Sequence, residues 1–291
     1  MTIREIQAKT LLAHVRGEDD YFGLKYNLNL YRGCQHQCIY CDSRSKCYGI
    51  EDFRDVLVKA NALEVLEKEL RRKRVKGTIG FGSMNDPYGP VEKQYNLTGQ
   101  ALQLVARYGF PVHLITKSEL VLKDIDTLVE INRQTLAVVS FSFSTADDEL
   151  ARKVEPGASL PSARWRAMAA LASRGIHTGV AMMPILPFLE DTPENITAIV
   201  EQTAAHGGRY ILPWFGMSLR EGSREYFYEQ LDRLFPGLRS KYEARYGERY
   251  TCPAPNARAL EKLFGELCAR LGIDQKIQRY KPVTAEQLSL F

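Results

Sequence analysis

The residues best suited to chemistry are the cysteines, of which the chain has six. Three of them, Cys34, Cys38 and Cys41, stand close together in a C-x3-C-x2-C spacing. Thiolates grouped in this way on one loop can bind a soft metal centre. Because a structural zinc site uses four protein ligands, three cysteines favour an iron–sulfur cluster with one iron left open to a substrate or cofactor.

Two other interpretations of the cysteine group stay open. His36 or Cys47 could complete a zinc site, or the thiols could simply be buried. Cys47 is near enough in sequence to serve as a hydrogen-atom donor, although an inert thiol is also expected there. The remaining cysteines, Cys252 and Cys268, are predicted to be inert.

The segment around the cysteines resembles a known family. The pattern Cys-x3-Cys-x-aromatic-Cys, with Tyr40 as the aromatic residue, is similar to the signature of radical S-adenosylmethionine (radical SAM) enzymes. More narrowly, residues 26–219 resemble the spore photoproduct lyase-like branch in the order and spacing of several segments. The matching segments are NLYRGCQHQCIYCDSRS, GSMNDPYGPVE, HLITKS, VVSFSFST and VEPGAS.

The resemblance implies the cofactors and the reaction class. In this family a [4Fe-4S] cluster binds S-adenosylmethionine through its open iron. Reduction then breaks a carbon–sulfur bond and gives a 5′-deoxyadenosyl radical, which abstracts a hydrogen atom from the substrate. An electron donor such as flavodoxin or ferredoxin is therefore an expected partner. The implied fold is a partial (βα)6 barrel.

Several residues at predicted strand ends could hold the cofactor, since catalytic groups of a barrel gather at the carboxyl ends of its strands. Small residues after the second strand would admit the methionine part of S-adenosylmethionine. Lys117 could neutralise its carboxylate, and serines of the fourth strand could donate hydrogen bonds. Alternatively, these serines form only a polar strand face and Lys117 is solvated. The predicted cofactor-binding residues are Tyr40, Gly82, Ser83, Asn85, Lys117, Ser142 and Ser144.

The sequence leaves open the route by which a substrate radical is quenched. The resembled lyase carries a cysteine just after the second strand, where this chain has Ser83-Met84-Asn85. A serine O–H bond is too strong to donate a hydrogen atom readily. Tyr88 is a candidate radical relay, with a packed tyrosine as the alternative. Arg164 is a candidate for a substrate phosphate contact or an active-site salt bridge, with a surface arginine as the alternative.

The C-terminal pentapeptide resembles the motif by which bacterial polymerases and repair proteins bind the DNA sliding clamp. Leu290 and Phe291 would form an apolar anchor pair, Gln287 would supply amide hydrogen bonds, and Leu288 completes the motif. An apolar end packed on its own domain is the alternative. A basic run over residues 68–76 and the Tyr/Arg-rich segment 239–250 are weaker indications of nucleic-acid binding.

The predicted elements place these groups on an α/β barrel. Strands are expected at 27–30, 78–81, 112–116, 136–143, 177–182 and 210–212, alternating with helices at 60–73, 98–108, 122–133, 162–173 and 192–206. Ser162 and Thr192 are predicted helix N-caps. Further helices are expected at 222–235 and 256–271. The predicted divisions are an N-terminal extension (1–25), the barrel (26–215), a C-terminal helical region (216–283) and a tail (284–291).

Composition narrows the class of protein without naming a substrate. With 291 residues, 45% hydrophobic and 25% charged, the chain is typical of globular proteins and not of disordered ones. Its net charge of +4 permits a nucleic-acid partner but does not argue for one. No membrane span or secretory signal is recognisable, so we expect a cytoplasmic protein. The candidate functions are a radical SAM enzyme acting on DNA, the same chemistry on RNA, a nucleoside or a protein side chain, or a non-catalytic iron–sulfur or zinc protein recruited to the clamp.

Overall fold

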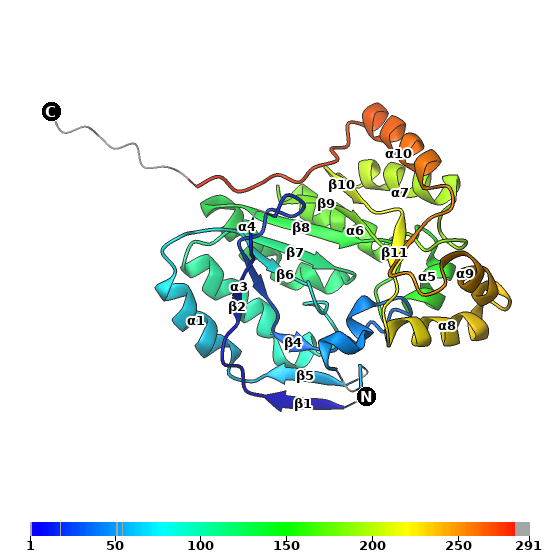
Figure 1. Ribbon diagram of the computed structural model, residues 1–291. Coiled ribbons are helices and arrows are strands. Elements are labelled where there is room, and N and C mark those ends of the chain that lie inside the picture. Colours follow the sequence, from blue (N-terminus) through cyan, green and yellow to red (C-terminus); the bar gives the residue numbers. More distant parts are fainter. Residues whose placement is uncertain (1, 18, 51, 54, 283–291) are drawn as a thin grey trace.

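A curved, mostly parallel sheet of seven strands forms the frame of the protein (Figure 1). The computed structural model describes residues 2–17, 19–50, 52–53 and 55–282. Across the sheet the strand order is β10-β9-β8-β7-β6-β3-β2, and only β2 runs antiparallel to its neighbour. The strands are β2 (Leu12–His14), β3 (Tyr26–Leu28), β6 (Ile79–Phe81), β7 (Val112–Thr116), β8 (Ala137–Ser142), β9 (His177–Met182) and β10 (Ile211–Pro213).

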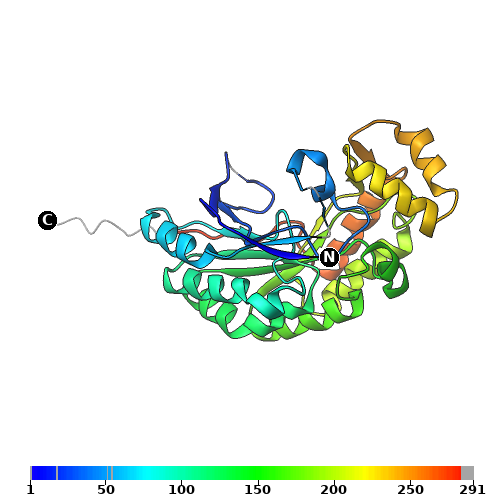
Figure 2. The ribbon, with the colours of Figure 1, turned by 90° about the horizontal axis from the view of Figure 1, so that it is seen from below.

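Helices cover the convex side of this sheet, while the N-terminal strands and the cysteine loop lie on its other side (Figure 2). The helices between strands are α1 (Ala62–Arg72), α2 (Glu92–Tyr95), α3 (Leu97–Arg107), α4 (Ile125–Gln134), α5 (Asp148–Val154), α6 (Pro161–Ser173) and α7 (Pro193–Ala205). The C-terminal helices are α8 (Ser223–Leu234), α9 (Leu238–Tyr246) and α10 (Ala257–Leu271). Parallel strands joined by helices give the partial α/β barrel that the alternation predicts.

All six predicted barrel strands are present: β7 and β9 have the predicted bounds, and the ends of the others differ by one or two residues at most. Strand β8 is buried along its whole length because helices cover one face and the barrel interior the other. In α1, Leu66 and Leu70 are fully buried at helical spacing, with Leu63 packed beside them. The hydrophobic pattern therefore located the elements that carry the main core.

The structure adds elements that the pattern did not predict. Strands β1 (Ile3–Ile6), β5 (Val56–Lys59) and β4 (Tyr31–Arg32) form a small separate sheet. The C-terminal region contains the expected helices and also one strand pair, β11 (Gly216–Ser218) with β12 (Thr251–Pro253). These strands lie outside the alternation of strands and helices from which the barrel strands were predicted.

One predicted helix start is right and one is wrong. The Thr192 side chain accepts a hydrogen bond from the Asn195 amide at 3.2 Å, as an N-cap does. The N-cap of α6, by contrast, is Leu160, and Pro161 occupies the first turn. Ser162 is already helical, and its hydroxyl donates to Asp148 instead.

A second apolar core joins the cysteine loop to the C-terminal helices. It contains Ile39 and Tyr40 from the loop, together with Phe227 and Tyr242 from α8 and α9. In the Tyr/Arg-rich segment, the buried tyrosines thus serve packing, as an amphipathic helix would require, and not strand binding. None of the described helices has the length and apolar character needed to cross a membrane.

Candidate active site

A cavity of about 360 Å³ opens at the carboxyl ends of the barrel strands. It is the edge of the sheet at which barrel enzymes carry their catalytic groups. The residues that line it come from the cysteine loop, from the ends of β6 to β10 and from β11. They are Cys34, His36, Cys38, Tyr40, Cys41, Asp42, Ser43, Tyr48, Gly82, Ser83, Met84, Asn85, Asp86, Ile115, Thr116, Lys117, Ser142, Met183, Pro184, Trp214, Met217 and Ser218.

The three clustered cysteines all face this cavity. Their loop begins at Gly33, whose φ of +79° and close approach to Asp55 require glycine, since a Cβ would lie 2.1 Å from the Asp55 carbonyl oxygen. Farther along, the Ile39 amide donates to the Val154 carbonyl at 2.9 Å. The loop thus passes close to the Asp55 backbone at Gly33 and is hydrogen-bonded to the Val154 backbone at Ile39.

The thiols fit an iron–sulfur cluster in position and chemistry. Burial raises the pKa of Cys34 to about 12, and that of Cys38 well above its ordinary value. Without a positive centre these buried thiols would stay protonated, whereas a bound metal deprotonates its thiol ligands. The side chains are therefore available as thiolates when a cluster binds.

The zinc alternative receives no support from the candidate fourth ligands. His36 turns its Nδ1 to the Gly157 carbonyl at 2.9 Å and its Nε2 to Asp86 at 3.1 Å. Cys47 is exposed and lies 3.5 Å from an Arg220 nitrogen, outside the cavity lining. Within the described ranges, no three His, Cys, Asp or Glu side chains converge on a single metal-ion position.

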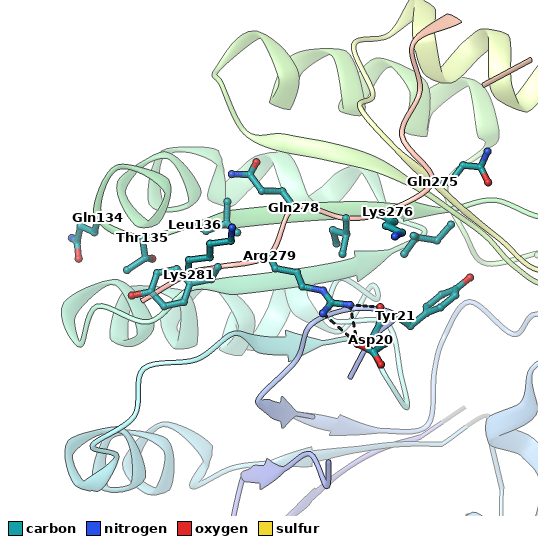
Figure 3. A pocket seen from close by; sticks show the side chains of 13 residues that line it. Asp20, Tyr21, Gln134, Thr135, Leu136, Gln275, Lys276, Gln278, Arg279 and Lys281 are labelled. Atoms are coloured by element: carbon teal, nitrogen blue, oxygen red, sulfur yellow. Dashed lines mark hydrogen bonds and ion pairs between the residues drawn. The ribbon is translucent and has the colours of Figure 1, made fainter. Parts of the chain in front are cut away.

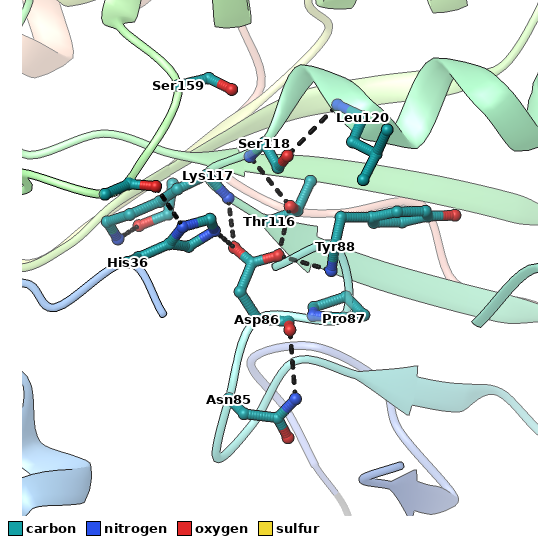
Figure 4. Close-up of polar contacts among 12 residues, drawn as sticks. His36, Asn85, Asp86, Pro87, Tyr88, Thr116, Lys117, Ser118, Leu120 and Ser159 are labelled. Carbon is teal, nitrogen blue, oxygen red and sulfur yellow. Dashed lines mark hydrogen bonds and ion pairs between the residues drawn. The ribbon is translucent and has the colours of Figure 1, made fainter. Parts of the chain in front are cut away.

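Asp86 ties the cysteine loop to the barrel (Figure 4). Its carboxylate accepts from the Thr116 hydroxyl at 2.7 Å and the Lys117 amide at 2.6 Å, while His36 approaches from the loop. Burial alone would raise the pKa of Asp86, but His36 and the hydrogen bonds from the Thr116 hydroxyl and the Lys117 amide lower it to about 2. Asp86 therefore makes these contacts as a carboxylate.

Glu155 makes a second buried connection beneath the cavity. It is 3% exposed and accepts hydrogen bonds from Tyr40 of the loop and Arg164 of α6. The Lys117 ammonium lies 3.7 Å from the same carboxylate and donates to the Ser142 hydroxyl at 2.6 Å. Although burial raises it, the pKa of Glu155 is lowered overall because Arg164 and Lys117 favour the carboxylate.

Most of the predicted cofactor-binding residues line the same cavity. Gly82 must be glycine, because its φ is +99° and a Cβ would lie 2.3 Å from the Ile115 carbonyl oxygen. Ser144 is the exception among the predicted serines: it is fully buried, outside the lining, and its hydroxyl donates to Glu155 at 3.4 Å. The others in contact with the cavity are Tyr40, Ser83, Asn85, Lys117 and Ser142.

Each of the candidate relay and substrate residues lies in one of the alternative environments considered for it. Tyr88 is buried and donates to Asp124 at 3.0 Å, with its ring directed away from His36 and Asp86 (Figure 4). Arg164 is 1% exposed, and its donors are bound by Ser159, the Ser142 carbonyl and Glu155, so it makes the salt bridge and neither a phosphate contact nor a surface group. Cys47 faces solvent.

Sequence inspection missed part of the cavity lining. Met183, Trp214 and Met217 contribute to it, and Tyr48 adds a phenol whose hydroxyl donates to Asp42 at 3.1 Å. Trp214 directly follows β10, and Met183 follows β9, so their positions after predicted strands were the available signal. These side chains are apolar or aromatic and polarizable, in contrast with the charged Asp86 and Lys117 of the same lining.

The fold and the cysteine-lined cavity define a radical SAM enzyme. The model of the Radical SAM superfamily matches residues 28–203, and the chain belongs to that superfamily. Its members use a [4Fe-4S] cluster and S-adenosylmethionine. An uncharacterized protein of Mycobacterium tuberculosis (strain ATCC 25618 / H37Rv) is 31% identical over 93% of this chain and 81% of its own length. One from Methanocaldococcus jannaschii is 29% identical over 74% of this chain and 78% of its own.

Among solved structures, spore photoproduct lyase shares this fold. A phenylalanine-for-tyrosine mutant of that lyase matches with a TM-score of 0.70 at 15% identity, over 94% of this chain and 80% of its own. The lyase complexed with dinucleoside spore photoproduct matches with a TM-score of 0.69 at 16% identity, over 93% and 80%. A radical S-adenosylmethionine methyltransferase from Kitasatospora setae gives a TM-score of 0.52 at 14% identity, over 85% and 52%.

Adding one methyl group at Gly157 should displace the cysteine loop. This glycine exchanges two hydrogen bonds with His36, and a Cβ would lie 2.3 Å from the Gln35 carbonyl oxygen. We expect Gly157→Ala to lower the unfolding free energy by about 1–3 kcal/mol and to reduce iron bound after reconstitution several-fold. Chemical denaturation and iron analysis measure the two effects. Gly265→Ala on α10, where a Cβ has room, is the control; equal iron content in both variants would refute the role of Gly157.

The buried carboxyl of Glu190 should make stability depend on pH. Burial raises its pKa to about 8, against smaller lowering effects of the Leu186 amide and the Ser144 hydroxyl. The unfolded chain releases this proton near the ordinary value of 4.5, so stability should fall between pH 4.5 and 8, at up to about 1.4 kcal/mol per pH unit. Glu190→Gln should remove that slope in denaturation series, whereas Glu194→Gln at an exposed position should keep it. A wild-type slope that survives Glu190→Gln would contradict this assignment.

Proposed function

We propose that this radical SAM enzyme acts on nucleic acid, most specifically on a damaged or modifiable base of DNA. The observation that carries the proposal is the composition of the cavity lining, in which three thiols and the charged Lys117 are joined by an aromatic side chain, Trp214, that is 38% exposed. A base that leaves its stack is bound by stacking on aromatic side chains. The likeness of the fold to a lyase solved with a dinucleoside photoproduct supports the same substrate class.

The residues that line the cavity have separate roles in this proposal. Cys34, Cys38 and Cys41 would hold the cluster, and the cluster with S-adenosylmethionine supplies a 5′-deoxyadenosyl radical. Lys117 would neutralise the carboxylate of S-adenosylmethionine, with Ser142 holding the ammonium in place as it does at 2.6 Å. Gly82 leaves room for the methionine part of the cofactor. Met183 and Met217, which also line the cavity, would keep water from the reacting atoms.

The return of a hydrogen atom to the substrate should differ from the lyase that the sequence resembles. Of the described residues that line the cavity, the only thiols belong to the proposed cluster ligands. Ser83, in the Ser83-Met84-Asn85 segment where that lyase has a cysteine, exchanges hydrogen bonds with Asn29 at 3.2 Å. We therefore propose lyase-like hydrogen abstraction with a different closing step.

Anaerobic reconstitution followed by product analysis tests the function. The wild-type protein, given a reductant and S-adenosylmethionine, should form 5′-deoxyadenosine, and the Cys34→Ala, Cys38→Ala and Cys41→Ala variants should lose at least 100-fold of that activity because each removes a cluster ligand. Cys268→Ala is the control, since this thiol is buried away from the cavity. Ultraviolet-irradiated and undamaged DNA, RNA and peptides are then compared as substrates by mass spectrometry.

The comparison of substrates decides among the candidate functions. A change of mass in irradiated DNA alone supports lesion repair, and a change in undamaged DNA supports base modification. If 5′-deoxyadenosine forms while only RNA, a nucleoside or a peptide is altered, the DNA proposal is wrong and the radical chemistry stands. If no 5′-deoxyadenosine forms from loaded protein, the enzyme assignment itself fails.

We also propose that the C-terminal pentapeptide brings the enzyme to the DNA sliding clamp. Gln287, Leu288, Leu290 and Phe291 lie outside the described residues, so the proposal depends on the motif alone. Replacing both Leu290 and Phe291 by Ala removes the apolar anchor and should weaken binding to the purified clamp at least tenfold in calorimetry. Ser289→Ala is the matched control. Undiminished binding by the double variant would refute this docking mode.

A further inference from the structure

A groove of about 1170 Å³ runs from Tyr21, which is bonded to Pro213 at the carboxyl end of β10, to Gln134, Thr135 and Leu136, which precede the amino end of β8. Residues 275–281, which follow α10, form one of its borders, and Asp20 and Tyr21 form another (Figure 3). The wall between them is made by Gln134, Thr135, Leu136 and Leu212. A smaller hollow of about 490 Å³ shares Thr135, Leu136 and Gln278 with the groove and extends it toward Arg209.

Positive charge predominates along this groove and its extension. The lining contains the cations Lys276, Arg279, Lys281 and Arg209, whereas Asp20 is the one acidic residue among its described members. Of these cations only Arg279 forms an ion pair within the described part of the chain, with Asp20 at 3.4 Å. The remaining ammonium and guanidinium groups can therefore bind an anion without breaking a salt bridge.

Apolar packing and hydrogen bonds hold the borders of the groove in place. Ile277 is buried with Leu136 and Leu212 in a small apolar cluster, which fixes the C-terminal border against the sheet. Arg279 donates to the backbone and the carboxylate of Asp20, which fixes the two borders to each other (Figure 3). The cations thus stand on an anchored segment and not on a loose end.

Two exposed aromatic side chains connect the groove with the catalytic cavity. Tyr21 lines the groove and is 41% exposed, and Trp214 lines the cavity and is 38% exposed. The Tyr21 hydroxyl donates to the carbonyl of Pro213, the residue before Trp214, at 3.0 Å. Exposed aromatic rings that alternate with cations are the usual surface for single-stranded nucleic acid, because rings stack with bases and cations bind phosphates.

We propose that single-stranded nucleic acid runs from the catalytic cavity over Trp214 and Tyr21 into this groove. One nucleotide would occupy the cavity, its neighbour would stack at the rim, and the phosphates beyond would meet Lys276, Lys281 and Arg209. The proposal rests on the proposed function and extends it, since it makes the substrate a strand and not a free nucleoside. The groove then holds the strand while the cavity selects the base.

Binding experiments on the reconstituted holoenzyme without reductant test this path of the strand, here called the track. Oligothymidylates of two and twelve nucleotides are compared by competition and fluorescence anisotropy at several salt concentrations. The twelve-mer should bind at least tenfold more tightly than the dinucleotide. Lys276→Glu with Lys281→Glu should abolish that advantage and reduce the salt slope by about 1.4, at roughly 0.7 for each phosphate that the protein no longer neutralises. Dinucleotide affinity should not change.

Arg258→Glu with Lys262→Glu is the matched control, because it makes the same charge change on exposed positions of α10 outside the groove. If both double variants weaken the twelve-mer equally, the effect is one of net charge and the track is refuted. Equal affinity for both lengths in the wild type also overturns it, even where lesions in dinucleotides are processed. Length-dependent binding without any change to the bound strand would leave the track intact and refute the proposed function instead.

Discussion

The buried carboxylate of Glu155 is the contact on which the arrangement of the site depends. It accepts hydrogen bonds from Tyr40 of the cysteine loop and Arg164 of α6, and it lies 3.7 Å from the Lys117 ammonium at the end of β7. Three segments far apart in the sequence thus meet at one charge. Removing one partner of a buried ion pair typically costs about 3–5 kcal/mol, because the other charge is left without compensation in the interior. The loop with the thiols is therefore held by electrostatics that only the folded barrel can complete.

Asp86 makes a similar buried connection between the cysteine loop and the barrel. It joins His36 of the cysteine loop to the Thr116 hydroxyl and the Lys117 amide. Lys117 therefore has two parts: its backbone holds Asp86, while its side chain lies between Glu155 and Ser142. The charged groups at the strand ends therefore fix the position of the cysteine loop. The same contacts also fix the Lys117 ammonium at the surface of the cavity.

The sequence was sufficient where a periodic pattern or a motif carried the information. The strands β6 to β9 and the thiols of Cys34, Cys38 and Cys41 could be placed from it, because apolar alternation and local spacing need no tertiary knowledge. The site of Arg164 could not, since the choice between surface, substrate contact and ion pair depends on Glu155, nine residues away on a different element. Tyr88 failed for the same reason: its environment is set by Asp124.

The missed lining residues have a different cause. Met183 and Trp214 follow β9 and β10, and they line the same cavity as the thiols because the curved sheet gathers the carboxyl ends of its strands there. Curvature is a property of how strands twist and pair over the whole sheet, so a local window reports only that these residues follow a strand. Tyr21 and the segment 275–281 form the groove beside β10, the edge strand of the same sheet. The residues that would distinguish one substrate from another thus depend on the least local feature of the fold, while the cofactor end is set by its most local motif.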